Sequence, residues 1–340
     1  MKPNSFWTYG KSALFAVASV EPSINVTSRE IDDRLAPALR RMRLPKGLLT
    51  RVAGVKARRH WVDEDEMFRA VTEAGNSALK DAGITADDVG LLINTSITRP
   101  HLEPSVAVRL HESIGLPPGA LNFDITNACL GFVNGITLAA SMIEAGQVEH
   151  ALIVNGENAG HLQDTTMQRL LTEDLGREEF LTQFATLTLG SGAVAAVVSR
   201  SDLLGQGHRL VRGVARAATQ YNALCIGDEN GMTTHSAEML EGAMKLISET
   251  WSDASRPESW SDMDRYFIHQ VSKVHTGMMA DTVGIDHDRV PVTYPHRGNV
   301  GPASIPITLA EQQDTLRPGD RVLLAGVGSG MNASMLELTW

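Results

Sequence analysis

Apolar runs of strand length alternate along the chain with segments of helical periodicity. In the first half, the predicted strands are Val89–Asn94, Leu121–Thr126, Ala151–Val154 and Ala193–Ser199. A helical pattern from Leu130 to Ala145 joins the second of these runs to the third, and it ends at Gly146, a residue suited to a helix C-terminus. Strands separated by helices are typical of the α/β class with parallel pairing.

The second half of the chain repeats this plan. Its predicted elements are the strands Tyr266–His269, Val292–Tyr294 and Val322–Ala325, and the helix Ala303–Gln313. Ile136–Ala139 recurs as Ile307–Ala310, and Ala151–Val154 maps onto Val322–Ala325, both at an offset of 171 positions. These matches predict a duplicated unit, with halves at residues 1–200 and 201–340. Only a loop-like stretch at 201–207 separates them, so we expect the halves to pack tightly.

Composition and charge narrow the class of protein. The apolar stretch Ala13–Val20 lacks a leucine-rich centre, so we expect a first core strand rather than a signal peptide. No apolar run approaches the ~18 residues of a membrane span. The net charge of −10 argues against nucleic acid or an anionic membrane as the main partner. The two cysteines, Cys129 and Cys225, form neither a disulfide framework nor a metal-binding spacing, which predicts a reducing, cytoplasmic location.

Three side chains are candidates for chemistry. Cys129 stands where a predicted strand passes into a helix, and the helix dipole and free backbone N–H groups there favour a thiolate. His269 closes a predicted strand, and Asn299 precedes a predicted helix between Gly298 and Gly301. Taken singly, each is also compatible with a structural role, such as a buried cysteine or a satisfied histidine.

Three alternate glycines follow the last predicted strand, at Gly326, Gly328 and Gly330. They do not satisfy the spacing of a dinucleotide-binding loop, and too little chain remains for a nucleotide domain. We therefore predict a turn that presents backbone N–H groups to an oxyanion.

Four motifs together carry a family resemblance. They are Asn127-Ala128-Cys129-Leu130-Gly131-Phe132, Ile268-His269-Gln270, Gly298-Asn299-Val300-Gly301-Pro302-Ala303-Ser304 and Gly328-Ser329-Gly330. In type and order they resemble the Cys, His, Asn and glycine-loop motifs of the ketoacyl synthase III branch of the thiolase superfamily. The resemblance runs over essentially the whole chain. It implies a thiolase-like five-layer αβαβα sandwich built from two similar halves, and a dimer.

Within that branch, the segment Asn94–Ser105 resembles OleA-type enzymes, the long-chain acyl-CoA condensing enzymes of head-to-head hydrocarbon biosynthesis. Ordinary ketoacyl synthase III proteins have an apolar aromatic residue where this chain has Glu103. In OleA-type enzymes a glutamate at this position enters the partner subunit's active site. Without the resemblance, Glu103 is interpreted as a solvated residue before a proline.

The resemblance implies a non-decarboxylative Claisen condensation of two fatty acyl-CoA thioesters. A plain acyl-CoA has no carboxylate to lose, so a base must remove its C2 proton, and a carboxylate in an apolar tunnel is a stronger base because its pKa is raised. His269 and Asn299 would hold the enolate oxygen, and the N–H groups of Cys129 and Ser329 would hold the oxyanion during acyl transfer to Cys129. The product would be a 2-alkyl-3-ketoacyl thioester, or the β-keto acid.

The remaining expectations concern ligands and partners. Arg51, Lys56 and Arg58 are candidates for the CoA mouth, although a solvated basic face explains them nearly as well. No metal or bound cofactor is expected. The partners would be long-chain acyl-CoA, a second subunit (the same chain or a paralogue), and enzymes of a downstream hydrocarbon or β-lactone pathway. The alternatives are a decarboxylating β-ketoacyl synthase III using malonyl-carrier protein, and a supporting subunit of an OleA-like heterodimer.

Overall fold

The computed structural model of the chain describes residues 4–205, 207–254 and 260–340. Its main feature is one ten-stranded mixed sheet. In sheet order the strands are β12 (Arg265–Ile268), β13 (Arg321–Gly328), β14 (Asn332–Thr339), β9 (His208–Ala217), β2 (Ser12–Val20), β8 (Gly192–Arg200), β7 (His150–Glu157), β5 (Leu91–Asn94) and β6 (Leu121–Asp124), with β1 (Ser5–Thr8) on β9. Pairing is parallel among β6, β5 and β7 and between β12 and β13, and antiparallel elsewhere.

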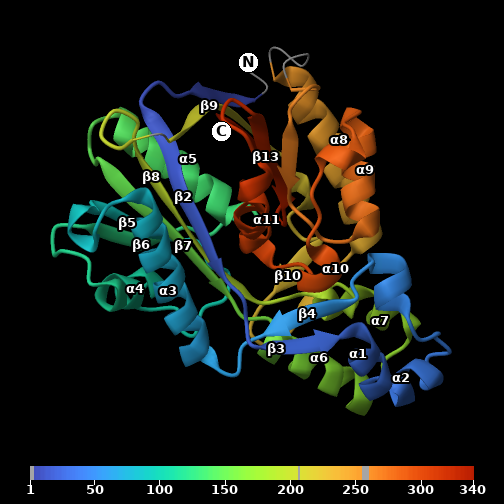
Figure 1. Cartoon of the computed structure of the whole chain (residues 1–340). Coiled ribbons are helices and arrows are strands. Elements are labelled where there is room, and N and C mark those ends of the chain that lie inside the picture. Colours follow the sequence, from blue (N-terminus) through green and yellow to red (C-terminus); the bar gives the residue numbers. More distant parts are fainter. Residues whose placement is uncertain (1–3, 206, 255–259) are drawn as a thin grey trace.

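Helices cover both outer faces of this sheet and fill the space between its two halves (Figure 1). The outer helices are α3 (Glu64–Ala82) and α4 (Val106–Ile114) on one side, and α8 (Ser236–Asp253) and α9 (Lys273–Val283) on the other. The central helices are α5 (Gly131–Glu144) and α11 (Ser304–Gln312), and each contacts strands of both half-sheets. This arrangement confirms the five-layer αβαβα sandwich.

Side-chain alternation along the strands explains the layers. On β5, Ile93 faces the central core while Leu92 packs under α3. On β13, Leu324 faces the same central core while Leu323 packs under α8. Successive side chains of a strand point to opposite faces, so strands that are apolar throughout can be covered on both sides.

The two half-sheets have the same connectivity. The order β2-β8-β7-β5 matches β9-β14-β13-β12 in strand direction, and β7 and β13 begin 171 positions apart, as the sequence repeat predicts. The halves join directly where β2 pairs with β9 at Ala13↔Arg209 and Leu14↔His208. The division of the chain at residues 1–200 and 201–340 stays a prediction.

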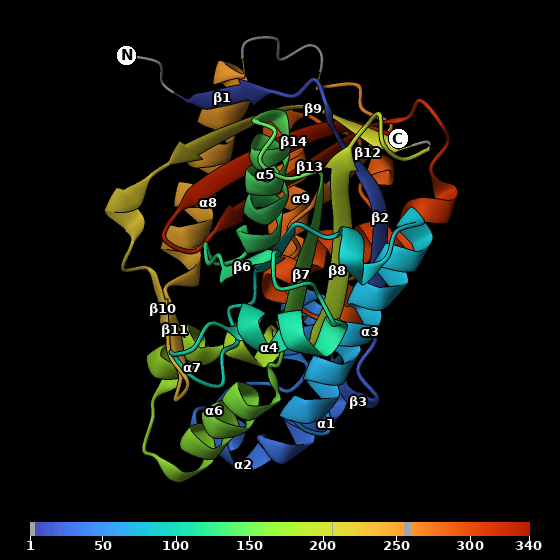
Figure 2. The same cartoon turned by 90° about the vertical axis from the view of Figure 1, so that its left-hand side faces the viewer.

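A smaller layer adjoins the sandwich (Figure 2). It contains the hairpins β3 (Ile24–Thr27) with β4 (Ala57–His60) and β10 (Cys225–Gly227) with β11 (Met232–Thr234), and the helices α1 (Ser28–Arg34), α2 (Ala36–Arg41), α6 (Gly160–Thr172), α7 (Arg177–Gln183) and α10 (Tyr294–Arg297). Helices α1, α2, α6 and α7 share an apolar core of their own. Among the described residues, no helix is long and apolar enough to cross a membrane.

The predicted strand Val292–Tyr294 is wrong. This segment has no strand partner, and α10 begins at Tyr294 with Pro295 in its first turn. The side-chain Oε1 of Gln270 accepts from the backbone N–H groups of Thr293 and Tyr294 at 2.7 and 3.1 Å. Because a side chain satisfies these donors, the segment does not need a neighbouring strand.

Candidate active site

Cys129 lies in a tight turn between β6 and α5. Ala128, directly before it, has a φ of +46°, a left-handed conformation that is costly for a residue with a Cβ. Asn127 anchors the turn, since its Nδ2 donates to Asn134 at 2.7 Å and its Oδ1 accepts from Asn332 at 3.3 Å. The second of these bonds ties the nucleophile turn to β14 in the other half of the molecule.

The three alternate glycines after Leu324 let three pieces of backbone meet at this turn. A Cβ on Gly326 would lie 2.9 Å from the Cβ of His269 and 3.2 Å from Cδ2 of Leu130. A Cβ on Gly328 would lie 3.0 Å from the Asn127 carbonyl oxygen and 3.4 Å from the Cys129 nitrogen. Gly330 has a φ of +80° in the turn before β14. The glycines therefore place β13, His269 and the Cys129 turn in direct contact.

Burial dominates the electrostatics of the thiol. It raises the pKa of Cys129 to about 12, and the neighbouring Cys225 and Glu157 act in the same direction. The backbone N–H groups of Cys129 and Ser329 reach the sulfur and lower the pKa, but by less. The predicted thiolate is therefore not the favoured form in the free chain, because desolvation outweighs the helix start.

His269 is a fully buried imidazole at the end of β12. Its backbone N–H donates to the Ala325 carbonyl at 2.9 Å, which fixes it beside β13. Neither ring nitrogen has a hydrogen-bond partner among the described residues. Burial, together with His275 at a ring distance of 6.3 Å, lowers the pKa of His269 to about 3. A neutral imidazole with both nitrogens free is ready to donate to a ligand oxygen.

Two backbone hydrogen bonds fix Asn299 in the segment before α11. Its N–H donates to the Thr188 carbonyl at 2.9 Å, and its carbonyl accepts from Gly190 at 2.8 Å. Its side-chain Oδ1 accepts from the N–H of Gly301 at 2.9 Å, and no described residue accepts from Nδ2. The amide therefore presents a fixed donor. Gly298 is required here, because a Cβ on it would lie 2.5 Å from the Thr188 oxygen and its φ is +68°.

Glu103 is not part of this buried centre in the single chain. It lies in the loop between β5 and α4, on the surface, with a cis peptide bond to Pro104. Its neighbour Leu102 is 91% exposed. The structure thus brings Cys129, His269 and Ser329 together inside the subunit and leaves Glu103 in an exposed loop.

Comparisons with known proteins agree with this geometry. The sequence-family model of 3-oxoacyl-[acyl-carrier-protein (ACP)] synthase III matches residues 123–212. The family model of the C-terminal part of that enzyme matches residues 256–340. The chain is 39% identical to an acyl-CoA:acyl-CoA alkyltransferase of Xanthomonas campestris over 96% of this chain and 98% of that one. It is 30% identical to the Shewanella oneidensis protein of the same description, over 98% and 99% of the two chains.

Solved structures extend the likeness to three dimensions. A Xanthomonas campestris OleA structure superposes with a TM-score of 0.95 at 38% identity, over 99% of this chain and all of that one. A variant of that OleA with bound lauric acid and lauroyl-CoA superposes with a TM-score of 0.94 over 98% of this chain and 100% of that one, also at 38% identity. The chain belongs to the OleA family of the thiolase superfamily. It is therefore a condensing acyltransferase.

The basic residues predicted for the CoA mouth of this OleA-family chain separate into two groups. Arg51 is exposed in a short π-helical turn, Leu49–Ala53, and donates to the Lys46 carbonyl at 2.6 Å. Lys56 is also exposed. Arg58, in contrast, is fully buried and donates to Ser28 Oγ at 3.0 Å and to the Leu187 carbonyl at 2.8 Å, so its guanidinium does not reach the surface of the single chain.

Sequence reasoning missed one residue near this centre, Glu157. It ends β7, is 6% exposed, and lies close enough to Cys129 to raise the pKa of the thiol. The available signal was a charged residue shortly after the apolar run Ala151–Val154. The repeat also makes it the counterpart of Gly328, 171 positions later.

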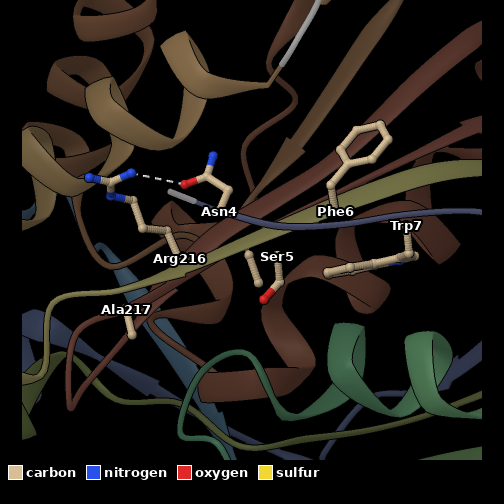
Figure 3. A pocket seen from close by; sticks show the side chains of 7 residues that line it. Asn4, Ser5, Phe6, Trp7, Arg216 and Ala217 are labelled. Atoms are coloured by element: carbon tan, nitrogen blue, oxygen red, sulfur yellow. Dashed lines mark hydrogen bonds between the residues drawn. The ribbon is translucent and has the colours of Figure 1, made fainter. Parts of the chain in front are cut away.

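A surface hollow elsewhere does not belong to this site. Figure 3 shows it between β1 and the end of β9, with the side chains of Asn4 and Arg216 joined by a 3.0 Å hydrogen bond. None of the predicted catalytic residues lines it. Among the described residues, no cluster of His, Cys, Asp and Glu could hold a metal ion.

Proposed function

We propose that this chain joins two fatty acyl-CoA thioesters by a Claisen condensation without decarboxylation. In the first half-reaction, the Cys129 sulfur attacks the carbonyl carbon of one acyl-CoA. The carbon–sulfur bond to CoA breaks, and CoA leaves with the proton from the thiol. The backbone N–H groups of Cys129 and Ser329 stabilise the oxyanion formed on the way.

In the second half-reaction, a second acyl-CoA becomes the nucleophile. Its thioester oxygen accepts hydrogen bonds from His269 and from Nδ2 of Asn299. A carboxylate, Glu103 of the other subunit, removes the C2 proton, and the resulting carbanion attacks the acyl carbonyl on Cys129. The bond to sulfur breaks and releases a 2-alkyl-3-ketoacyl-CoA, which gives the β-keto acid on hydrolysis.

The observation that carries this assignment is the buried, unpartnered imidazole of His269 beside the Cys129 turn. With its pKa near 3, His269 is neutral at physiological pH. It can donate a hydrogen bond to a developing enolate, but it is a poor acceptor for a C2 proton. A separate base is then required, and Glu103 is our candidate.

We propose that the second subunit is another copy of this chain. Strand β6 is at the end of the sheet, and Leu121 at its start is 50% exposed. The exposed Leu102 and Ile97 lie in the loop that follows the adjacent strand β5. An open strand edge beside apolar side chains favours a two-fold interface. Pairing there would allow Glu103 to reach the other subunit.

The remaining proposals follow from the chemistry. The reaction needs a thiol, a base and hydrogen-bond donors, and all three are side chains or backbone groups, so no bound cofactor or metal is required. Two free cysteines suit a cytoplasmic location. The β-keto product would pass to hydrocarbon or β-lactone pathway enzymes.

The decisive experiment is incubation of the pure protein with one long-chain acyl-CoA and no malonyl donor, with products identified by mass spectrometry. We expect free CoA and a β-keto acid containing both acyl chains. Cys129→Ala is the control and should give neither. Product formation only after malonyl-carrier protein is added would identify a decarboxylating synthase instead.

A further inference from the structure

A buried carboxylate that this mechanism does not use lies at the root of the Glu103 loop. Glu157 ends β7, and its side chain extends under the first residues that follow β5. Oε1 accepts from the backbone N–H of Ile97 at 2.8 Å, and Oε2 accepts from the N–H and the hydroxyl of Thr98 at 3.1 and 2.7 Å. Asn155 Nδ2 adds a longer contact of 3.3 Å.

These bonds form a directed chain. The Thr98 hydroxyl donates to Glu157 and accepts from the backbone N–H of Asn158 at 3.1 Å. Because a hydroxyl has one proton, this arrangement requires an acceptor at Glu157. Burial raises the pKa of Glu157, while the donors of Ile97, Thr98 and Asn155 oppose this shift because they stabilise the carboxylate. The same bonds fix the backbone of Ile97 and Thr98.

The rest of the loop has few other anchors. Asp124 accepts from the backbone of Val106 and Ala107, both at 2.9 Å, and lies 4.0 Å from Arg99. His101, Leu102 and Glu103 make no hydrogen bond to any of the described residues. Two carboxylates therefore hold the ends of the segment that carries Glu103, Glu157 at its start and Asp124 at its end.

Glu157 also borders its own active site. A Cβ on Gly301 would lie 4.0 Å from Cδ of Glu157 and 3.6 Å from Cδ1 of Ile97. The N–H of Gly301 is held by the Asn299 side chain. One carboxylate thus lies between the Asn299 turn of its own subunit and the loop that carries Glu103.

We propose that Glu157 is a positioning residue for proton abstraction in the partner subunit: it fixes the start of the loop from which Glu103 reaches the other active site. This inference rests on the proposed function. It predicts that loss of the carboxylate impairs condensation without slowing acylation of Cys129, because removal of the Glu157 charge lowers the pKa of the thiol rather than raising it.

The test variant is Glu157→Gln, which keeps the shape but faces the donors of Thr98 with an amide that can satisfy fewer of them. We expect the condensation rate to fall roughly tenfold, with a CoA burst no smaller than in wild type, since one buried hydrogen bond to this side chain is lost. Glu144→Gln is the matched control. Glu144, at the end of α5, also accepts from two successive backbone N–H groups, of Gly10 and Lys11, and from the hydroxyl of Ser12, but these partners lie where β1 leads into β2.

Hybrid dimers then separate action in cis from action in trans. The reference hybrid pairs a Cys129→Ala chain, which supplies Glu103, with a Glu103→Ala chain, which supplies Cys129. Glu157→Gln is added to one chain or to the other. We expect the loss only when it is on the chain that supplies Glu103. A loss that follows the Cys129-bearing chain would overturn the proposal and assign Glu157 to its own site.

A second measurement is independent of activity. Hydrogen exchange of peptides spanning residues 97–103 should be faster in Glu157→Gln than in wild type or Glu144→Gln. Unchanged exchange there would refute the positioning role. If the reference hybrid is inactive but exchange in this loop rises, the trans arrangement fails while Glu157 still fixes the loop.

Discussion

The centre around Cys129 and the loop that carries Glu103 differ in almost every physical respect. Around Cys129, each backbone segment is fixed by strand pairing or by glycine contacts, and the thiol and the imidazole of His269 are both neutral because burial opposes charge. The Glu103 loop is exposed, and Leu102 has almost no contact with its own subunit. The subunit therefore holds the groups needed for acylation, while the proposed base is presented outward.

The largest effect is expected at the nucleophile. Cys129→Ser should reduce acyl-enzyme formation by roughly 10⁴-fold or more, because a hydroxyl is a far weaker nucleophile in a site that disfavours charge. Cys225→Ser should leave it nearly intact. Peptide mass spectrometry after incubation with acyl-CoA measures both, and an acyl adduct on Cys225 would contradict the assignment.

The next effect separates the two half-reactions. Glu103→Ala should retain a one-turnover burst of CoA release and a stable acyl-enzyme, but condensation should fall by ~10²–10⁴-fold, the usual cost of removing a general base. Glu103→Gln should behave alike, since an amide cannot take the proton. Near-wild-type condensation by Glu103→Ala would favour the decarboxylating synthase.

Exchange of C2 deuterium isolates proton removal itself. His269→Ala and Asn299→Ala should slow condensation because the enolate oxygen loses donors. Any exchange of C2 deuterium that remains in these variants should disappear when Glu103→Ala is added. Exchange that survives the double substitution would mean that another group is the base.

Hybrid dimers test whether the two regions meet across an interface. Cys129→Ala and Glu103→Ala homodimers should each be inactive, but mixing equal amounts should restore up to roughly a quarter of wild-type activity, because half of the dimers are hybrids and each has one complete site. Absence of rescue, with subunit exchange verified by native mass spectrometry, would contradict the trans arrangement.

The smallest effect concerns stability against acid. Burial lowers the pKa of His269 to about 3 and that of His275 to about 4, from an ordinary value of 6.5. Between these values the unfolded chain binds more protons, so stability is full above pH 6.5 and falls as pH decreases. Relative to its value above pH 6.5, the free energy of unfolding at pH 5 is expected to be lower by about 2 kcal/mol for each of these histidines.

Urea unfolding at several pH values measures this slope. His269 and His275 together contribute to this pH dependence of the free energy of unfolding. His275→Gln should remove about half of their joint contribution. His287→Asn is the control, because His287 is exposed and already bonded to Asp281 at 2.8 Å. A slope unaffected by His275→Gln would show that other groups cause the acid sensitivity.

The sequence predicted best those parts of the fold in which local pattern and tertiary environment agree. The apolar runs Ala151–Val154 of β7 and Val322–Ala325 of β13 are covered by helices on both faces, so the existence, repeat and order of these strands could be predicted. Strand β9 was missed because Arg212 and Arg216 interrupt its pattern. Their charges are compensated by contacts distant in sequence, Glu337 for Arg212 and Glu249 for Arg216.

In the active site too, features that depend on contacts distant in sequence could not be predicted. Cys129, His269 and Asn299 were found because their motifs are local. The burial of Arg58 and the bonds of Glu157 were not predictable, since both depend on loops far away along the chain. The high pKa of Cys129 was missed for a similar reason, because desolvation depends on what packs around the sulfur and not on its place before a helix.

The glycines after Leu324 offer a criterion for distinguishing active from inactive copies of this gene. A side chain at Gly326 or Gly328 would displace its neighbours, because a Cβ there would lie 2.9 Å from the Cβ of His269 or 3.0 Å from the Asn127 carbonyl oxygen in the Cys129 turn. A duplicated gene that kept the Cys, His and Asn codons but acquired an alanine or serine codon at either glycine would still appear intact in a motif search. Its product should be catalytically silent, which marks such copies as candidates for partners that serve only to complete an active neighbour.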